Sequence, residues 1–126
     1  MTVAKRFAKI SAMSSFEEVQ QYRIHVALML DFYGQLLPDR AREVLECYFF
    51  DDYSLTEIAD LFQISRQAVH DRLHQGLNSL LNYEEKLGLV ARSFKQKEMI
   101  RAVVDNLDKG HAAEAKDLLK QLDQML

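Results

Sequence analysis

The strongest constraint on the fold is a pair of short helical segments, each preceded by a serine suited to cap it. Residues 54–57 read Ser-Leu-Thr-Glu, a capping box in which both polar side chains satisfy backbone groups at a helix start. Ser65 offers a second N-cap a few residues later. Between them, Ala59 is small enough for a second helix to cross close to the first. The spacing predicts a helix-turn-helix over residues 54–83.

Helical spacing of apolar residues extends along most of the chain. It predicts further helices at about residues 16–35, 39–50, 91–107 and 111–125. Pro38 is suited to the first turn of the second of these helices, and Gly88 to the end of the helix that Ser65 begins. Only four glycines and one proline occur in 126 residues, so a multi-strand sheet is not expected. The predicted fold class is all-α.

This pattern predicts three parts, all within one domain-sized chain. Residues 1–22 form an N-terminal extension, frayed or helical, residues 23–87 the helix-turn-helix core, and residues 88–126 a pair of C-terminal helices. The last helix carries an apolar stripe that either folds back within one chain or pairs two chains. These alternatives are compatible, and we predict a homodimer. The stripe consists of Ala115, Leu118, Leu119, Leu122, Met125 and Leu126.

Composition bears on the cellular location of the protein. Its longest apolar run, Val26–Leu30, is far too short to cross a membrane. Cys47 is the only cysteine, which excludes an internal disulfide and gives no sign of an oxidising compartment. We therefore predict a cytoplasmic protein without a membrane span.

Charge is distributed unevenly around a net value of −3. Residues 31–62 carry eight acids and two bases, whereas residues 63–83 carry two bases and one acid. No segment has the Lys/Arg stripe expected of a protein that holds duplex DNA by its phosphates. Arg23 and the basic N-terminal segment are the other cations that could reach a phosphate.

Several segments carry a family resemblance. The stretch from Ser54 to Val69 resembles the region-4 helix-turn-helix of bacterial sigma factors. The sequences of residues 30–37, 51–59, 65–69 and 83–84 look like those of the YlxM family, small bacterial proteins with a sigma region-4-like fold. The resemblance covers roughly residues 24–105. One position departs from the family pattern, because Gln63 stands where the turn usually has a glycine at positive φ.

The resemblance implies a regulatory part in the signal recognition particle pathway, because YlxM genes lie beside those of its GTPases. The protein would then be an adaptor or regulator with a signal recognition particle protein or RNA as partner. The alternative is a transcription regulator that binds duplex DNA through residues 54–83. Both remain open at this point.

If the second helix binds nucleic acid, its exposed side identifies the contact residues. Gln67 has an amide suited to adenine edges, Arg66 a guanidinium for phosphate or guanine, and Ser65 a capped helix start for phosphate. Asp71, in the middle of the same face, repels phosphates. The candidate nucleic-acid-binding residues are Ser65, Arg66, Gln67, His70, Arg72, His74 and Asn78.

The remaining constellations do not predict catalysis. His70 and His74 have the spacing of a zinc-protease motif, but Asp71 replaces the glutamate and no third ligand follows nearby, so a surface histidine pair is favoured. Cys47 lies beside an apolar stripe and is interpreted as a small core residue. The glycines are isolated and form no phosphate-binding loop. We predict no enzyme, no metal and no cofactor.

Overall fold

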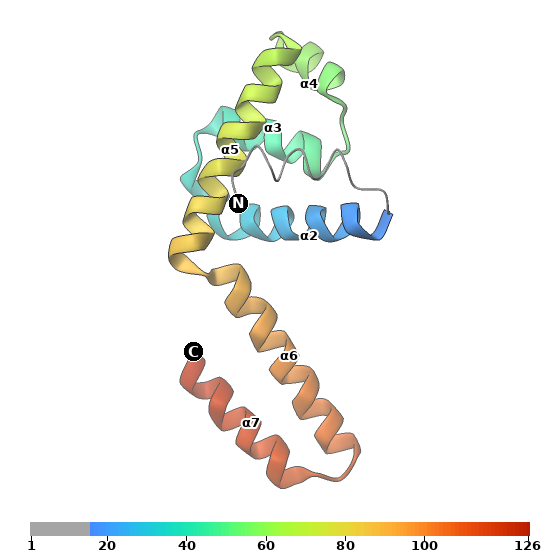
Figure 1. The fold of residues 1–126 in the computed structure, drawn as a ribbon, viewed down its shortest axis with the longest axis vertical. Helices are drawn as coiled ribbons and strands as arrows, with labels where there is room; N and C mark the ends of the chain where they lie inside the picture. Colours follow the sequence, from blue (N-terminus) through green and yellow to red (C-terminus); the bar gives the residue numbers. More distant parts are fainter. Residues whose placement is uncertain (1–15) are drawn as a thin grey trace. The chain divides into compact units, whose positions relative to one another are not determined.

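The structure is a computed structural model that describes the backbone of residues 16–126 and the side chains of residues 22–126 (Figure 1). This part of the chain forms six α-helices and one short 3-10 helix, without a strand. The all-α prediction is confirmed. The predicted extension of residues 1–22 lies outside the described residues up to residue 15, and residues 16–22 belong to the first helix.

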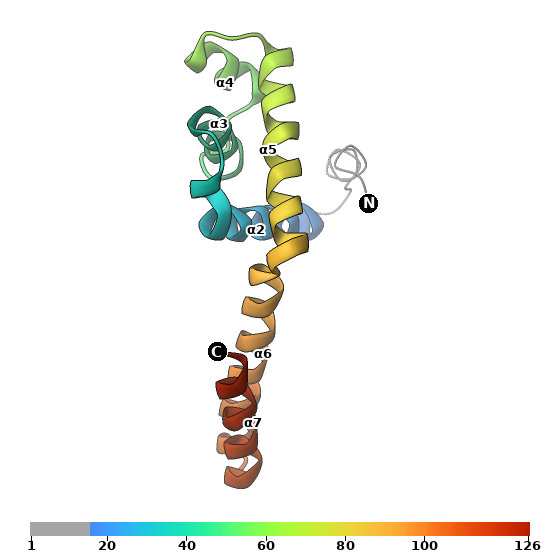
Figure 2. The ribbon, with the colours of Figure 1, turned by 90° about the vertical axis from the view of Figure 1, so that its left-hand side faces the viewer.

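The described chain divides into two compact units between Gly88 and Leu89. The first unit contains five elements, which are α2 (Phe16–Tyr33), η1 (Gly34–Leu36), α3 (Asp39–Phe49), α4 (Leu55–Phe62) and α5 (Arg66–Leu87). The long helix α5 contacts α2, α3 and α4, and Figure 2 shows α3 and α4 on the same side of it. The core of this unit therefore forms around α5.

Apolar residues from all four helices fill that core. Val26, Val44, Leu45, Ile58, Val69, Leu73 and Leu80 have no exposed surface. Gly76 allows α3 to approach α5, because a Cβ at this position would lie 2.6 Å from Cδ1 of Leu45. At the other end of α5, the buried Tyr33 donates a hydrogen bond from its hydroxyl to Glu84 Oε1 at 2.7 Å. Both contacts fix α5 against the helices that precede it.

The start of α3 differs in detail from the prediction. Pro38 is the N-cap, with φ −56° and ψ 143°, and not a residue of the first helical turn. Leu37 before it is also extended, with ψ 150°, as the ring of a following proline requires. Asp39 is the first helical residue, so its carboxylate still lies at the positive end of the helix dipole.

The second unit is a helical hairpin made of α6 (Leu89–Asp108) and α7 (Ala112–Met125). Gly110 has φ 77°, and the His111 N–H donates a hydrogen bond to the Asn106 carbonyl at 2.7 Å, which closes the turn. Val103 and Ala115 are buried. The helix α6 begins at Leu89, before the expected residue 91, because Gly88 alone, at φ 64°, ends α5. None of the helices in residues 16–126 has the length and apolarity needed to cross a membrane.

Candidate functional site: the α4–α5 surface

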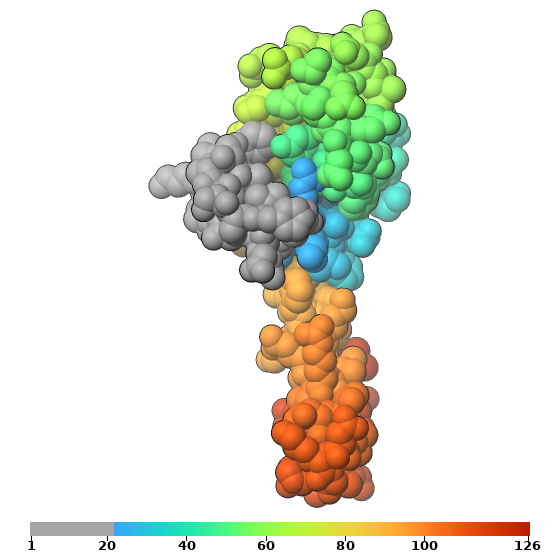
Figure 3. Space-filling view, turned by 90° about the vertical axis from the view of Figure 1, so that its right-hand side faces the viewer, coloured from blue at the N-terminus to red at the C-terminus, as the bar shows by residue number. Residues whose placement is uncertain are grey.

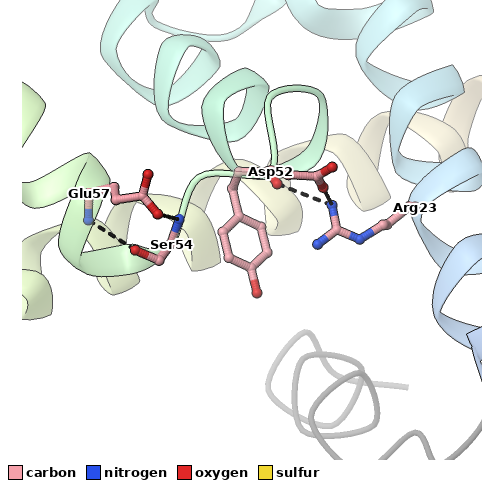
Figure 4. Close-up of polar contacts among 5 residues, drawn as sticks. Arg23, Asp52, Ser54 and Glu57 are labelled. Atoms are coloured by element: carbon pink, nitrogen blue, oxygen red, sulfur yellow. Dashed lines mark hydrogen bonds and ion pairs between the residues drawn. The ribbon is translucent and has the colours of Figure 1, made fainter.

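The entry to α4 is held by reciprocal hydrogen bonds (Figure 4). The Glu57 backbone N–H donates to Ser54 Oγ at 3.1 Å, and the Ser54 backbone N–H donates to Glu57 Oε1 at 3.3 Å. Two N–H groups that the helix start leaves without intrahelical partners are thereby satisfied. The capping box predicted from the sequence is confirmed.

The turn between α4 and α5 depends on Gln63. Its backbone is left-handed, with φ 55° and ψ 47°, as expected at a position that usually holds glycine. Its side-chain Nε2 donates to the Asp60 carbonyl at 2.8 Å, and the Ile64 N–H donates to the Ala59 carbonyl at 3.0 Å. These bonds hold the chain in a conformation that costs a non-glycine residue about 1–2 kcal/mol.

Ser65 caps α5 as predicted, since its Oγ accepts a hydrogen bond from the Ala68 N–H at 3.0 Å. The next two residues, Arg66 and Gln67, are exposed. Val69, one turn further, has no exposed surface and is part of the contact between α4 and α5. The first turn of α5 is thus anchored on one side and presents polar side chains on the other.

The predicted contact residues on α5 are not equally available. Gln67 Nε2 donates to Asp71 Oδ1 at 2.9 Å, so a contact to adenine through this amide competes with an existing hydrogen bond. His70 and His74 are half-buried, with ring centroids 4.4 Å apart. Asn78 is exposed two turns beyond His70. The helix brings these residues onto one side, as the 100° spacing predicts.

Arg72 is less exposed than we predicted. We expected it at the edge of the contact face, but it is half-buried and its Nη1 atom is enclosed, without a hydrogen-bond partner among the described residues. On α5 it falls close to the buried stripe of Val69 and Leu73. Its guanidinium is therefore less accessible to a phosphate than that of Arg66.

The histidine pair has an unequal electrostatic environment. Burial lowers the pKa of His74 below its ordinary value, and the neighbouring His70 lowers it further, whereas Asp71 acts in the opposite direction. At neutral pH, His74 is therefore uncharged and adds no cation to the α4–α5 surface.

A contact that the sequence did not reveal fixes the loop before α4. Arg23 Nη1 donates to Asp52 Oδ1 at 2.8 Å and to the Tyr48 carbonyl at 3.2 Å, and the guanidinium lies over the Tyr48 ring at 5.7 Å (Figure 4). Asp52 has a positive φ of 56°, which is unusual for a residue other than glycine. Arg23, which the sequence offered as a phosphate contact, is thus engaged in positioning the entrance to α4.

The net charge of the helix-turn-helix is negative. Residues 51–83 contain five carboxylates and two arginines. Glu57, Asp60 and Asp71 are exposed, as is Arg66. Arg40 of α3 adds one cation nearby, with its guanidinium 5.5 Å from the centroid of the Phe62 ring. Such a surface favours a positively charged partner over a polyanion.

A shallow depression of about 250 Å³ lies between the starts of α4 and α5. Leu55, Arg66, Gln67 and His70 line it. Pockets that enclose small molecules are usually larger and more enclosed than this open depression. We therefore interpret it as part of a docking surface for a side chain of a macromolecular partner.

Within the described residues, no group of three or more His, Cys, Asp or Glu side chains is arranged to hold a metal ion. Cys47 is half-buried on α3. Burial raises the pKa of its thiol, and the carboxylates of Asp51, Glu46 and Glu43 add to this effect. Because the thiolate is the reactive form, these surroundings make Cys47 a poor nucleophile.

Comparison with known proteins agrees with this architecture. The model of the UPF0122 family, described as "Putative helix-turn-helix protein, YlxM / p13 like", matches residues 20–122. The UPF0122 protein of Desulforamulus reducens is 40% identical over 96 residues, which cover 76% of this chain and 82% of the relative. That of Symbiobacterium thermophilum is 37% identical over 97 residues, covering 77% of this chain and 91% of the relative.

A third relative is more similar over a shorter stretch. The UPF0122 protein of Caldanaerobacter subterraneus subsp. tengcongensis is 48% identical over 80 residues, or 64% of this chain and 66% of the relative. The resemblance to the YlxM family is thereby confirmed. The family model spans most of the chain and two relatives align over more than four fifths of their own length, so this chain belongs to the UPF0122 family of helix-turn-helix proteins.

Proposed function

We propose that the chain is a regulatory helix-turn-helix adaptor of the signal recognition particle pathway, which docks its α4–α5 surface on a basic protein partner. The observation that carries the proposal is the negative charge of this surface. Its α4 and α5 residues include the exposed carboxylates of Glu57, Asp60 and Asp71 and the exposed cation Arg66. The pathway itself comes from the YlxM resemblance, which points to the signal recognition particle and its GTPases.

The electrostatic argument concerns phosphates first. A duplex carries one negative charge for about every 1.7 Å of its axis, and a binding protein neutralises several of these charges with lysine or arginine. Here Arg23 is paired with Asp52 and Arg72 is half-buried, which leaves Arg66 as the accessible cation on the first turn of α5. The same carboxylates that repel phosphates attract basic side chains.

A second candidate is a DNA-binding transcription regulator. The exposed Arg66 and Gln67 at the capped start of α5 favour it, because a helix-turn-helix contacts base edges with the first residues of its second helix. Sigma factor region 4, which the same stretch resembles, is such a DNA-binding element. This candidate requires the Gln67–Asp71 hydrogen bond to be shared or broken.

Fluorescence-anisotropy titrations separate these functions. The labelled chain is titrated with the purified signal recognition particle GTPase, the particle's RNA and duplex DNA at several salt concentrations. We expect saturable binding to the GTPase and little binding to random duplex, with a log–log salt slope for the duplex of about −2 to −4. Nanomolar duplex binding with a slope steeper than about −6 would overturn the adaptor proposal.

Matched variants test which surface is used. Asp60→Lys reverses an exposed charge on α4, whereas Asp117→Lys makes the same change on the exposed side of α7. We expect Asp60→Lys to weaken GTPase binding about tenfold and Asp117→Lys to leave it unchanged. For the second candidate, Arg66→Ala weakens binding to all duplexes alike, and Gln67→Ala changes sequence preference only if a true operator exists.

A further inference from the structure

We propose that α6 pairs antiparallel with α6 of a second copy of this chain, through an apolar stripe formed by Ile100, Val104 and Leu107. These side chains are 49%, 52% and 56% exposed. At 100° per residue they fall within roughly 60° of one another on the helix. This interface lies outside the α4–α5 surface, so the proposal does not depend on the proposed function.

The stripe is only about half covered within the chain. The side of α6 that meets α7 carries the buried Val103, and α7 contributes the buried Ala115. Ile100, Val104 and Leu107 follow along the edge next to this contact, at spacings of four and three residues. Leu119 of α7 is a further exposed apolar residue, at 50%. Figure 3 shows one side of the hairpin surface, coloured orange to red.

The size of the unit supports a partner. Residues 89–126 form a compact unit below about 40 residues, a size at which folding usually needs disulfides, a metal or oligomerisation. The unit contains no cysteine, since Cys47 is the only one in the chain. In the part of the chain that the structure describes, no cluster of three or more metal-ligating side chains is found. Pairing with a second copy would bury apolar surface that so small a unit leaves exposed.

Charge complementarity identifies the partner as a second copy. Arg101 and Asp108 lie two helical turns apart along the outer edge of the stripe, and both are exposed. Neither makes an ion pair within residues 22–126, whereas the neighbouring Asp105 is paired with Lys109 at 3.0 Å. A charge of each sign on the same edge is what a self-complementary interface requires.

The direction of pairing follows from these positions. An antiparallel pair with its two-fold axis near residue 105 places Arg101 of each copy beside Asp108 of the other. The same register sets Val104 of each copy against Leu107 of the other, as in an antiparallel coiled coil. In a parallel pair the two-fold axis runs along the helices, so the edge with Arg101 and Asp108 would face the opposite edge of the second copy and these two charges would not meet. The charges therefore favour the antiparallel arrangement.

The interface is short, which determines its strength. In this register Val104 and Leu107 of the two α6 helices face each other, and Ile100 lies opposite the α6–α7 turn of the second copy near Gly110. These residues, with their neighbours on α7, bury less surface than the standard protein–protein interface of about 1,600 Å². We therefore expect a dissociation constant in the micromolar range, on the order of 1–50 μM. At such an affinity the chain exchanges between monomer and dimer as its concentration changes.

Sedimentation velocity of the full chain between about 1 and 200 μM tests the pairing. We expect a concentration-dependent monomer–dimer equilibrium, and Val104→Glu should abolish the dimer because it places a carboxylate inside the interface. Glu98→Arg, on the opposite side of α6, is the matched control and should leave the equilibrium unchanged. Far-UV circular dichroism of both variants establishes that the helices still form. A wild-type chain that stays monomeric at 200 μM, or a Val104→Glu dimer, overturns the proposal.

A charge exchange tests the register. Arg101→Asp and Asp108→Arg should each weaken self-association at least about tenfold, because each substitution creates two like-charge pairs. An equimolar mixture of the two variants should form the mixed dimer, in which both pairs are again opposite in sign. The chain carrying both substitutions should also dimerise. Failure of both the mixture and the double variant to associate contradicts the antiparallel pairing.

Discussion

The α4–α5 and α6–α7 pairs each join two helices through a short turn, but they differ in how the helix starts are capped. Each turn has one left-handed residue, Gln63 in the first and Gly110 in the second. In the first pair, serine side chains cap both helices. In the second, the N-cap of α7 is His111, whose side chain makes no capping hydrogen bond.

Their apolar residues differ as well. Ile58 and Val69, one on each helix of the first pair, have no exposed surface. In the hairpin, Ile100, Val104 and Leu107 are each about half exposed. The first pair is therefore specified by its own caps and by a core that α3 and α2 complete, while the second presents an apolar surface still available to a partner.

The largest expected effect is in amide hydrogen exchange. Amides in the centre of α5, around residues 73–80, should exchange at least about a hundredfold more slowly than those of residues 100–107 at low protein concentration. The reason is that the hairpin buries few side chains and opens locally. Exchange monitored by mass spectrometry at 1 and 100 μM checks this. Raising the concentration should protect residues 100–107 and leave α5 unchanged, and equal protection of both regions at 1 μM would remove the contrast.

The next effect concerns the crossing of α4 and α5. Ala59→Leu should lower the free energy of unfolding by about 2–3 kcal/mol, because Ala59 is buried and three added carbon atoms overpack the crossing. Urea denaturation followed by circular dichroism measures the change. Leu61→Ala, on the exposed side of the same helix, should cost less than about 0.5 kcal/mol. Similar values for the two variants would show that the helices do not meet at Ala59.

The caps predict a smaller pair of changes with opposite signs. Ser54→Ala removes the side-chain oxygen that accepts from the Glu57 N–H, which is one of the two bonds of the capping box, and should destabilise the protein by about 1 kcal/mol. His111→Asp gives α7 an oxygen that can accept from its first turn, and should stabilise the hairpin by about 0.5–1 kcal/mol. Urea denaturation and α7 amide exchange measure the two effects. A lower free energy of unfolding in both variants would show that the end of α6, rather than the missing cap, determines the start of α7.

The smallest expected effect is a pH dependence of the free energy of unfolding, which comes from His74 on α5. Because the pKa of His74 is lowered in the folded chain, the unfolded state binds more protons, so the stability is fully present above the unfolded pKa of about 6.5 and is lost as the pH falls from there through the lower pKa of the folded state. His74→Gln should flatten the stability profile between about pH 7 and 5. Urea denaturation of both chains between about pH 5 and 7 measures the change, and an identical profile for His74→Gln and the wild-type chain contradicts the prediction.

Local signals made the helices predictable. The left-handed turn at Gln63 was expected from the family resemblance, because glutamine itself does not favour positive φ. The Ser54 and Ser65 caps, by contrast, depend on residues within a few positions of one another, and the structure contains both. The end of α5 at Gly88 was equally local. Each of these features rests on the backbone preferences of one residue and its neighbours, which a single sequence displays directly.

Features that depend on distant residues could not be predicted in this way. Arg23 and Asp52 lie on different elements, and neither the ion pair nor the positive φ of Asp52 has a pattern in the sequence. Arg72 was expected at the edge of the contact face, but its partial burial depends on how α5 packs against other helices. The sequence thus identified residues that share one side of α5, but not how accessible each of them is, and their contact with a partner stays a prediction.

The Arg23–Asp52 contact has a thermodynamic consequence. The Asp52 side chain is 78% exposed, whereas that of Arg23 is 27% exposed, so any basic group that reached Asp52 from solvent would compete with Arg23. The binding free energy of a partner at Asp52 is reduced by the free energy needed to break the contact between Arg23 of α2 and the loop before α4. Linkage is reciprocal: a change that strengthens the Arg23–Asp52 contact by some factor lowers the affinity of a partner for Asp52 by the same factor. A single surface carboxylate thus couples ligand occupancy to the attachment of a helix at the opposite end of the sequence from the hairpin.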